Sequence, residues 1–355
     1  MVFNSIFFIF CFLPVFMLIY YLVPGKLRNL LLFLGSLIFY AWGEPVYVIL
    51  MLFSSIFNYY MGTELERLYY DDRKQKINLI FSIIINLAVL VFFKYYGFLL
   101  NTIGGIIGIH IPHPELSLPI GLSFYTFRNL SYLFDIYLSK VSAQRNFLTF
   151  AVYSTMFPYT SAGPIVRYTD IETQLKQRTI NISKFGIGAE LFVKGLAKKV
   201  LLADNLSVLY SSICGHPQMS VFTSWLGILA YTMQLYFDFS GYSDMAIGLG
   251  KMLGFDFNKN FDYPYISTSV SEFWRRWHIS LGSWFRDYIY IPLGGNRVST
   301  LKHIRNILVV WALTGLWHGA SWNFVLWGVY YGLFLLLEKF VLQKYLKKIP
   351  SWLCT

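Results

Sequence analysis

The sequence has few charged residues. Only 13% of its 355 residues are Asp, Glu, Lys or Arg, whereas a soluble globular protein has about 25%. Hydrophobic residues make up 56% of the chain, and several apolar runs reach the ~20 residues that a helix needs to cross a bilayer. This composition excludes an ordinary soluble globule and predicts an all-α polytopic membrane protein.

Acidic residues and cysteines are scarce as well. The 18 Asp and Glu against 29 Lys and Arg give a net charge of +11. The basic residues fall in short loops between apolar runs, which is typical of a topology signal in a membrane protein rather than of a nucleic-acid-binding surface. Cys11, Cys214 and Cys354 lie far apart and form no CxxC pair, so neither a disulfide framework nor a metal site is predicted.

The apolar runs predict a series of membrane segments. The run at 2–23 lacks a basic start and a small-residue cleavage site, which favours a retained first helix over a signal peptide. Further segments are expected at 29–42, 46–61, 77–100, 118–138, 220–239, 306–322 and 323–342. Basic loops near 26, 67–76 and 140–145 indicate the cytoplasmic side. The same rule places the N-terminus and the loop 101–117 outside and the basic end at 344–348 inside.

Three stretches do not fit a simple span. Residues 147–165 are apolar but interrupted by Pro158, Gly163 and Pro164, and such broken backbone is tolerated at membrane depth only where protein or a cavity surrounds it. We therefore expect a re-entrant segment there. The amphipathic stretch 191–202 and the basic, aromatic region 251–305 predict helices that lie in the membrane interface.

His318 interrupts the apolar run 307–317. An ionisable residue at membrane depth is costly and indicates a functional site, although a neutral histidine bonded between two helices remains an alternative. Gly315 and Gly319 beside it favour a crowded site. A neutral imidazole can accept the proton of a hydroxyl during acyl transfer.

A second histidine, His278, follows Trp274, Arg275, Arg276 and Trp277. Guanidinium groups pair with phosphates in a bidentate manner, so these arginines are candidates for holding a phosphate-bearing donor. The alternative is a cytoplasmic positive cluster with an aromatic belt. Loop charges place His278 near the cytoplasmic face and His318 deeper, which suggests a path through the bundle.

The segment 236–244 carries Tyr236, Asp238, Ser243 and Asp244 directly after a predicted span. It is interpreted either as a capped helix end or as a pair of carboxylates that orient the Arg-rich segment. Gly241-Tyr242-Ser243-Asp244-Met245 lacks the last glycine of a nucleophile elbow, which disfavours a serine hydrolase.

Several of these motifs resemble one known family. They are 119–127 (PIGLSFYTF), 162–167 (AGPIVR), 236–248 (YFDFSGYSDMAIG), 272–280 (EFWRRWHIS), 284–288 (WFRDY), 290–297 (YIPLGGNR) and 314–320 (TGLWHGA). They are similar to motifs of the membrane-bound O-acyltransferases, most of all the bacterial alginate O-acetyltransferase branch, with the D-alanyl transfer protein of teichoic acids as a more distant relative. The resemblance covers essentially the whole chain.

The resemblance implies a helical bundle with a transmembrane tunnel, formed by a single domain over residues 1–355 of a multi-pass protein of the cell (inner) membrane. It implies that His318 is catalytic, that His278 is a second important position, and that the acyl donor is acetyl-CoA or another thioester, with no bound cofactor. Arg286 with Arg275 and Arg276 is expected to handle donor phosphates, in a donor site or tunnel that also includes Trp317. The implied partners are membrane lipids, an exported polysaccharide as acceptor and an extracytoplasmic SGNH-type transferase, with no nucleic acid.

Members of this branch continue with further membrane helices beyond the position of Leu342, so we expect a C-terminally short member. Two other functions remain open. The broken segment and the polar residues also fit a transporter or export channel, although no repeated halves are evident. A membrane scaffold for a partner acyltransferase is the third possibility.

Overall fold

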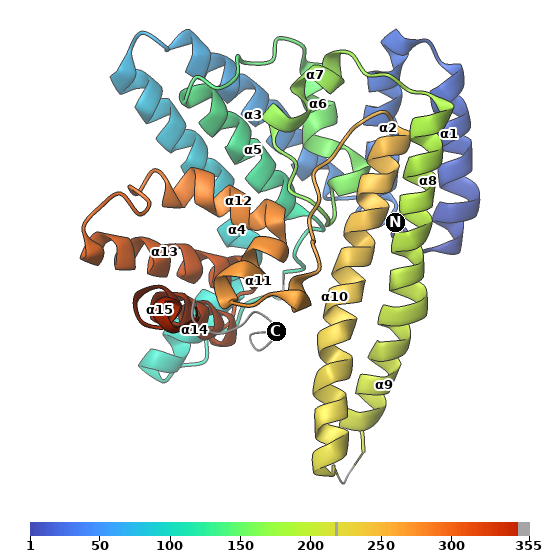
Figure 1. Cartoon of the computed structure of the whole chain (residues 1–355). Coiled ribbons are helices and arrows are strands. Elements are labelled where there is room, and N and C mark those ends of the chain that lie inside the picture. The colour runs from blue at the N-terminus through green and yellow to red at the C-terminus, as the bar shows by residue number, and fades with distance from the viewer. Residues whose placement is uncertain (115, 217–218, 347–355) are drawn as a thin grey trace. The chain divides into compact units, whose positions relative to one another are not determined.

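The computed structural model describes residues 1–114, 116–216 and 219–346. Every regular element in these ranges is a helix (Figure 1). The predicted basic end includes Lys347 and Lys348, which lie outside the described residues. Glu115 and the third cysteine, Cys354, lie outside them as well. The described chain forms two compact units, one of residues 1–52 and 146–260, the other of residues 53–145 and the chain from Phe261 on.

Helices that cross a membrane were expected at several places. In the described ranges three are long and apolar enough, namely Val48–Arg67, Asp72–Ile107 and Trp322–Tyr345. These three match the predicted segments at 46–61, 77–100 and 323–342. The predicted spans at 118–138, 220–239 and 306–322 coincide with helices that do not reach this length and mean hydropathy, because they are shorter or carry more polar residues.

The first unit contains the chain's beginning and its middle third. Its elements are η1 (Phe8–Phe12), α1 (Leu13–Leu22), η2 (Gly25–Leu27), α2 (Arg28–Ala41), α6 (Phe147–Thr155), η3 (Phe157–Tyr159), α7 (Tyr168–Lys176), α8 (Ile182–Ala197), η4 (Lys198–Ala203), α9 (Asp204–Cys214) and α10 (Val221–Met252). Phe157 packs among the rings of Phe39 (5.5 Å) and Phe16 (5.3 Å). The predicted break at 147–165 is therefore confirmed as a short helix, a 3-10 turn and irregular chain, and most of this stretch is buried.

One long helical pair dominates the first unit. α8, η4 and α9 follow one another without a break and run beside α10 (Figure 1). They approach closely because glycines face each other: a Cβ on Gly188 would lie 2.6 Å from the carbonyl oxygen of Gly248, and one on Gly195 would lie 2.5 Å from that of Gly241. The stretch 191–202, which we expected to lie partly in the membrane interface, forms the middle of this pair. Its apolar face therefore packs at least in part on a neighbouring helix, which sequence amphipathicity does not distinguish from a membrane surface.

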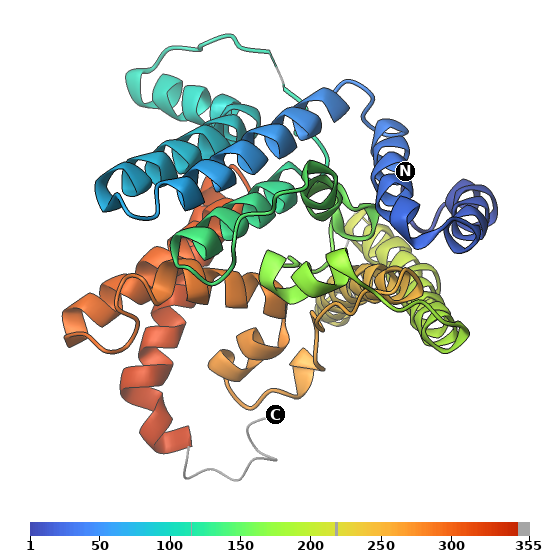
Figure 2. The same ribbon diagram turned by 90° about the horizontal axis from the view of Figure 1, so that it is seen from above.

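The second unit holds α4 (Asp72–Ile107), α5 (Leu122–Tyr137) and most of α3 (Val48–Arg67). Figure 2 shows these three as neighbouring helices that lie along one another. Buried amides join α3 to α4: Asn58 Nδ2 donates to Asn86 Oδ1 at 3.0 Å, and Asn86 Nδ2 donates back to Asn58 Oδ1 at 2.8 Å. In a bilayer the hydrophobic effect does not favour the association of two helices, so reciprocal hydrogen bonds of this kind help to hold them together.

The rest of the second unit carries the histidine motifs. Its elements are η5 (Pro264–Ile266), α11 (Val270–Arg276), α12 (Ile279–Phe285), η6 (Arg286–Tyr290), α13 (Thr300–His318), α14 (Trp322–Leu337), η7 (Glu338–Leu342) and α15 (Gln343–Leu346). α12 is fixed on α5 because Trp284 Nε1 donates to the carbonyl oxygen of Phe127 at 3.0 Å and the two rings stack at 4.1 Å. Tyr288, in η6, donates its hydroxyl to buried Asp135 at 2.8 Å.

Candidate functional site

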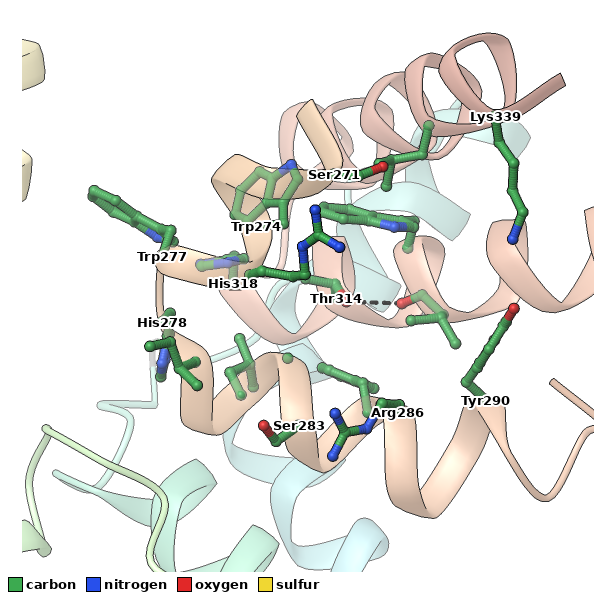
Figure 3. Close-up of a pocket in the computed structure, with 18 residues that line it drawn as sticks. Ser271, Trp274, Trp277, His278, Ser283, Arg286, Tyr290, Thr314, His318 and Lys339 are labelled. Carbon is green, nitrogen blue, oxygen red and sulfur yellow. Dashed lines mark hydrogen bonds between the residues drawn. The ribbon is translucent and has the colours of Figure 1, made fainter. Parts of the chain in front are cut away.

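A cavity of about 720 Å³ lies within the second unit (Figure 3). Its walls come from α11, α12, η6, α13 and α14 with η7. Six predicted site residues line it: Trp274, Arg275, Trp277, His278, Arg286 and His318. The remaining lining is mostly apolar and aromatic, with Ser271, Ser283, Tyr290, Thr314 and Lys339 as further polar side chains.

His278 stands at the turn between two short helices. It is the N-cap of α12 in the left-handed region (φ 45°, ψ 55°), a conformation that is costly for a residue with a Cβ. Trp277, just before it, is the C-cap of α11. The side chain of His278 is buried, at 3% exposure. Strained backbone that carries a buried histidine into a cavity wall is typical of a functional position.

His318 is the last residue of α13. The helix ends there because Gly319 is extended, and a Cβ on Gly319 would collide with the ring of Phe324. The imidazole packs against the rings of Trp317 and Trp327, both with centroids at 4.9 Å. The sequence-based expectation that Gly315 and Gly319 permit a crowded site is confirmed.

The two histidines share one neighbour. Trp317 has its ring centroid 4.9 Å from that of His318 and 5.7 Å from that of His278. Loop charges led us to place the histidines at different depths along a path. The structure puts both in the wall of one cavity, because α11 and α12 fold back onto α13, which loop charges do not reveal.

Cations also line the cavity. Arg286 pairs with Asp287, with Nε at 2.6 Å from Oδ1. Arg275 and Lys339, in contrast, pair with no carboxylate in the described part of the chain. The Nζ of Lys339 lies 3.1 Å from His303 Nε2, which also lies 3.0 Å from the hydroxyl of Tyr290. Neither of these neighbours carries a negative charge, so Lys339 has no counter-ion among the described residues beside the cavity.

Arg276 does not line the cavity. Its guanidinium binds Glu272, with Nε at 2.9 Å from Oε1, and donates to the carbonyl oxygen of Asp262 at 3.1 Å. It therefore ties α11 to the preceding loop, and its expected role in donor binding is not supported. Helical periodicity separates it from Arg275 by about 100°, so the two neighbours point to different surroundings.

The predicted acidic segment lies in the first unit. Tyr236, Asp238, Ser243 and Asp244 are all within α10, so the expected helix end after residue 239 is wrong. Asp238 pairs with Lys199 at 2.8 Å and Asp244 with Lys198 at 2.6 Å. The carboxylates thus bind lysines of the neighbouring η4, not the Arg-rich segment. Both lysines belong to the stretch 191–202, within the helical pair.

Ser243 is buried inside the same helix. Its Oγ accepts a hydrogen bond from Asn260 Nδ2 at 3.0 Å. A nucleophile elbow needs a sharp strand-to-helix turn that exposes the serine. The helical surroundings of Ser243 agree with the sequence argument against a serine hydrolase.

Two lysines near the site were missed from the sequence. Lys339 lines the cavity, and Lys94 of α4 donates a hydrogen bond to the carbonyl oxygen of Trp317. A usable signal existed for Lys94, since it is the only charged residue between positions 77 and 107. A lone charge within a membrane-length apolar helix points to a functional place.

Comparison with known proteins shows the family of the chain. The model of the membrane-bound O-acyltransferase family matches residues 42–347. The chain belongs to this family. It is 45% identical over 343 residues to the probable alginate O-acetylase of Pseudomonas aeruginosa, covering 96% of this chain and 66% of that protein. The family predicted from the sequence motifs is therefore confirmed.

Two further relatives have names that refer to other polymers. The peptidoglycan O-acetyltransferase of Helicobacter pylori is 35% identical over 396 residues, which cover 100% of this chain and 75% of that protein. The teichoic acid D-alanyltransferase of Bacillus subtilis is 29% identical over 264 residues, which cover 69% and 64% respectively. The chain spans about two thirds of the length of the alginate O-acetylases that it matches.

Proposed function

We propose that this protein is a membrane O-acyltransferase that passes an acetyl group from a cytoplasmic thioester, acetyl-CoA, through the cell (inner) membrane towards an exported polysaccharide of the alginate kind. The route is a tunnel through the helical bundle, and the final acceptor step involves a separate extracytoplasmic SGNH-type transferase. Similarity to alginate O-acetylases over 96% of the chain supports the chemistry. The single observation that carries the proposal is the cavity in which His318 and His278 meet unpaired cations.

The cations support a phosphate-bearing donor. Arg275 and Lys339 line a largely apolar cavity and have no carboxylate partner in the described ranges. A charge in such surroundings is stabilised by a counter-ion, and phosphate is the natural partner of guanidinium and ammonium groups. Arg286, which is already paired with Asp287, adds a third positive group on the opposite wall (Figure 3).

His318 is the proposed general base. It takes the proton of the hydroxyl that first receives the acetyl group, before the separate transferase completes the transfer to the glycan. As that oxygen forms a bond to the acetyl carbonyl carbon, the C–S bond breaks and the proton leaves on the thiol of CoA. The rings of Trp317 and Trp327 cover part of the His318 imidazole, and a site with little water protects a thioester from hydrolysis. His278 helps to orient the donor from the facing wall.

The test is transfer of labelled acetyl from acetyl-CoA to glycan in membranes, together with the exported partner transferase. We expect His318→Ala to lower the transfer rate at least about a hundredfold, the lower end of the effect of removing a general base. His216→Ala, at an exposed histidine, is the matched control and should keep the wild-type rate. Undiminished transfer by His318→Ala would refute the base. Wild-type membranes that export glycan without consuming acetyl-CoA would instead indicate a transporter or a scaffold.

A further inference from the structure

Lys94 is placed where a charge is expensive. It lies in α4, a helix long and apolar enough to cross a membrane, and it is the only charged residue between positions 77 and 107. The side chain is half-buried. A cation in an apolar helix is stabilised when polar groups of the protein replace the hydrogen bonds that it would make to water.

The end of α13 supplies these groups. Lys94 Nζ donates to the carbonyl oxygen of Trp317, and the hydroxyl of the adjacent Tyr95 donates to the carbonyl oxygen of Leu316. The last carbonyls of a helix have no partner within the helix and carry partial negative charge. α4 therefore closes the end of α13 with a cation, at the two residues directly before His318.

The same ammonium also lies near the indole. Lys94 Nζ is 5.7 Å from the ring centroid of Trp317, within the range of a cation–π contact. The Trp317 ring in turn contacts His318 and His278, and its Nε1 is buried without a hydrogen-bond partner in the described residues. Backbone and ring of Trp317 are thus held by Lys94 while its ring contacts both histidines.

We propose that Lys94 is a positioning residue for the two histidines: its ammonium binds the carbonyl oxygen and ring of Trp317 and so seats His318 and His278 in the cavity wall. This proposal rests on the proposed acyl transfer. Lys94 does not line the cavity, so we expect it to act through Trp317. Its effect is expected on the turnover step and not on donor binding.

The test measures kcat and KM for acetyl-CoA in the membrane transfer assay. We expect Lys94→Met to lower kcat by about 10- to 100-fold with KM changed less than about twofold, since a misplacement of about 1 Å can cost a hundredfold. Lys94→Arg, which keeps a positive donor, should recover a substantial part of kcat. Lys76→Met is the matched control, because it is the same substitution at an exposed position of the same helix, and it should match the wild type.

Several outcomes would overturn the role. A wild-type kcat in Lys94→Met, or a loss that appears as a raised KM, contradicts positioning. If Lys94→Met does not fold, the test uses Lys94→Gln, which keeps a hydrogen-bond donor but has no charge. An equal kcat for Lys94→Gln and the wild type then shows that the positive charge is not needed. His318→Ala distinguishes the two proposals: transfer that survives in that variant defeats the acyl-transfer base, whereas transfer lost in His318→Ala but intact in Lys94→Met defeats only the role of Lys94.

Discussion

Gly315 of α13 and Gly328 of α14 lie in backbone contact. A Cβ on Gly315 would stand 3.2 Å from the Cα of Gly328, and a Cβ on Gly328 would stand 3.0 Å from the Cα of Gly315. Only glycine at both positions allows this approach, as is common where membrane helices cross. The crossing sets how α13 delivers His318, three residues further on, to the cavity.

Replacing Gly328 should therefore destabilise the protein. In Gly328→Ala the new methyl group collides with the carbonyl oxygen of Trp311, which is backbone and cannot move aside cheaply. We expect a loss of about 1–3 kcal/mol, the usual cost of overpacking, seen as a lower melting temperature in detergent. Gly105→Ala in α4 is the control, since a Cβ there meets nothing within 4 Å; its melting temperature should stay the same or rise. Equal melting temperatures for the two variants would contradict the close crossing.

The sequence predicted those parts of the site that are formed by short, continuous motifs. The sequence predicted the histidine motifs, the glycines around His318 and the aromatic lining of the site. Each of these features is formed by residues that are close together in the chain, so a short motif is enough to recognise it. The three apolar membrane-length helices followed in the same way from run length alone.

Contacts between distant segments could not be predicted. Asp238 and Asp244 looked like partners of the arginines, but their lysines lie on η4, which the glycine-mediated approach of α8 and α10 brings to them. Lys339 reaches the cavity only because α14 packs across α13. Both histidines contact Trp317 only because of the way α11 and α12 fold. These helices are too short to show a hydrophobic periodicity in the sequence, so their arrangement could not be predicted.

Arg275 and Arg276 should respond differently to the same substitution. Arg275→Gln removes an unpaired cation from the cavity, so we expect KM for acetyl-CoA to rise by roughly tenfold or more, as for the loss of a charged hydrogen bond of about 1.5–3 kcal/mol. Lys339→Gln should act in the same direction. Arg276→Gln breaks the contacts with Glu272 and Asp262 and should lower the melting temperature with little change in KM. Steady-state rates and melting curves of the three variants check this. The phosphate-binding role of Arg275 is wrong if its substitution leaves KM unchanged.

Glu272 gives the start of α11 a dependence on pH. Its carboxylate accepts hydrogen bonds from the backbone N–H and the hydroxyl of Thr268, at 3.0 and 2.8 Å, and from Arg276 Nε at 2.9 Å. The Thr268 bonds first, and then Arg276, lower the pKa of Glu272 to about 2. Because the folded pKa lies below the ordinary value of 4.5, the stabilisation is complete above that value and is lost as the pH falls towards 2.

Melting curves in detergent between about pH 6 and pH 2 test this directly. The wild type should lose stability through this window, whereas Glu272→Gln should start lower at neutral pH and lose less, since it has no carboxylate to protonate. Glu64→Gln, at a residue that pairs with the exposed Arg67 in α3, is the control and should keep the acid-induced loss of the wild type. Parallel losses in wild type and Glu272→Gln would show that another group governs the acid sensitivity. A smaller loss in Glu272→Gln would tie the start of α11, and with it the approach of His278 to the cavity, to this one carboxylate.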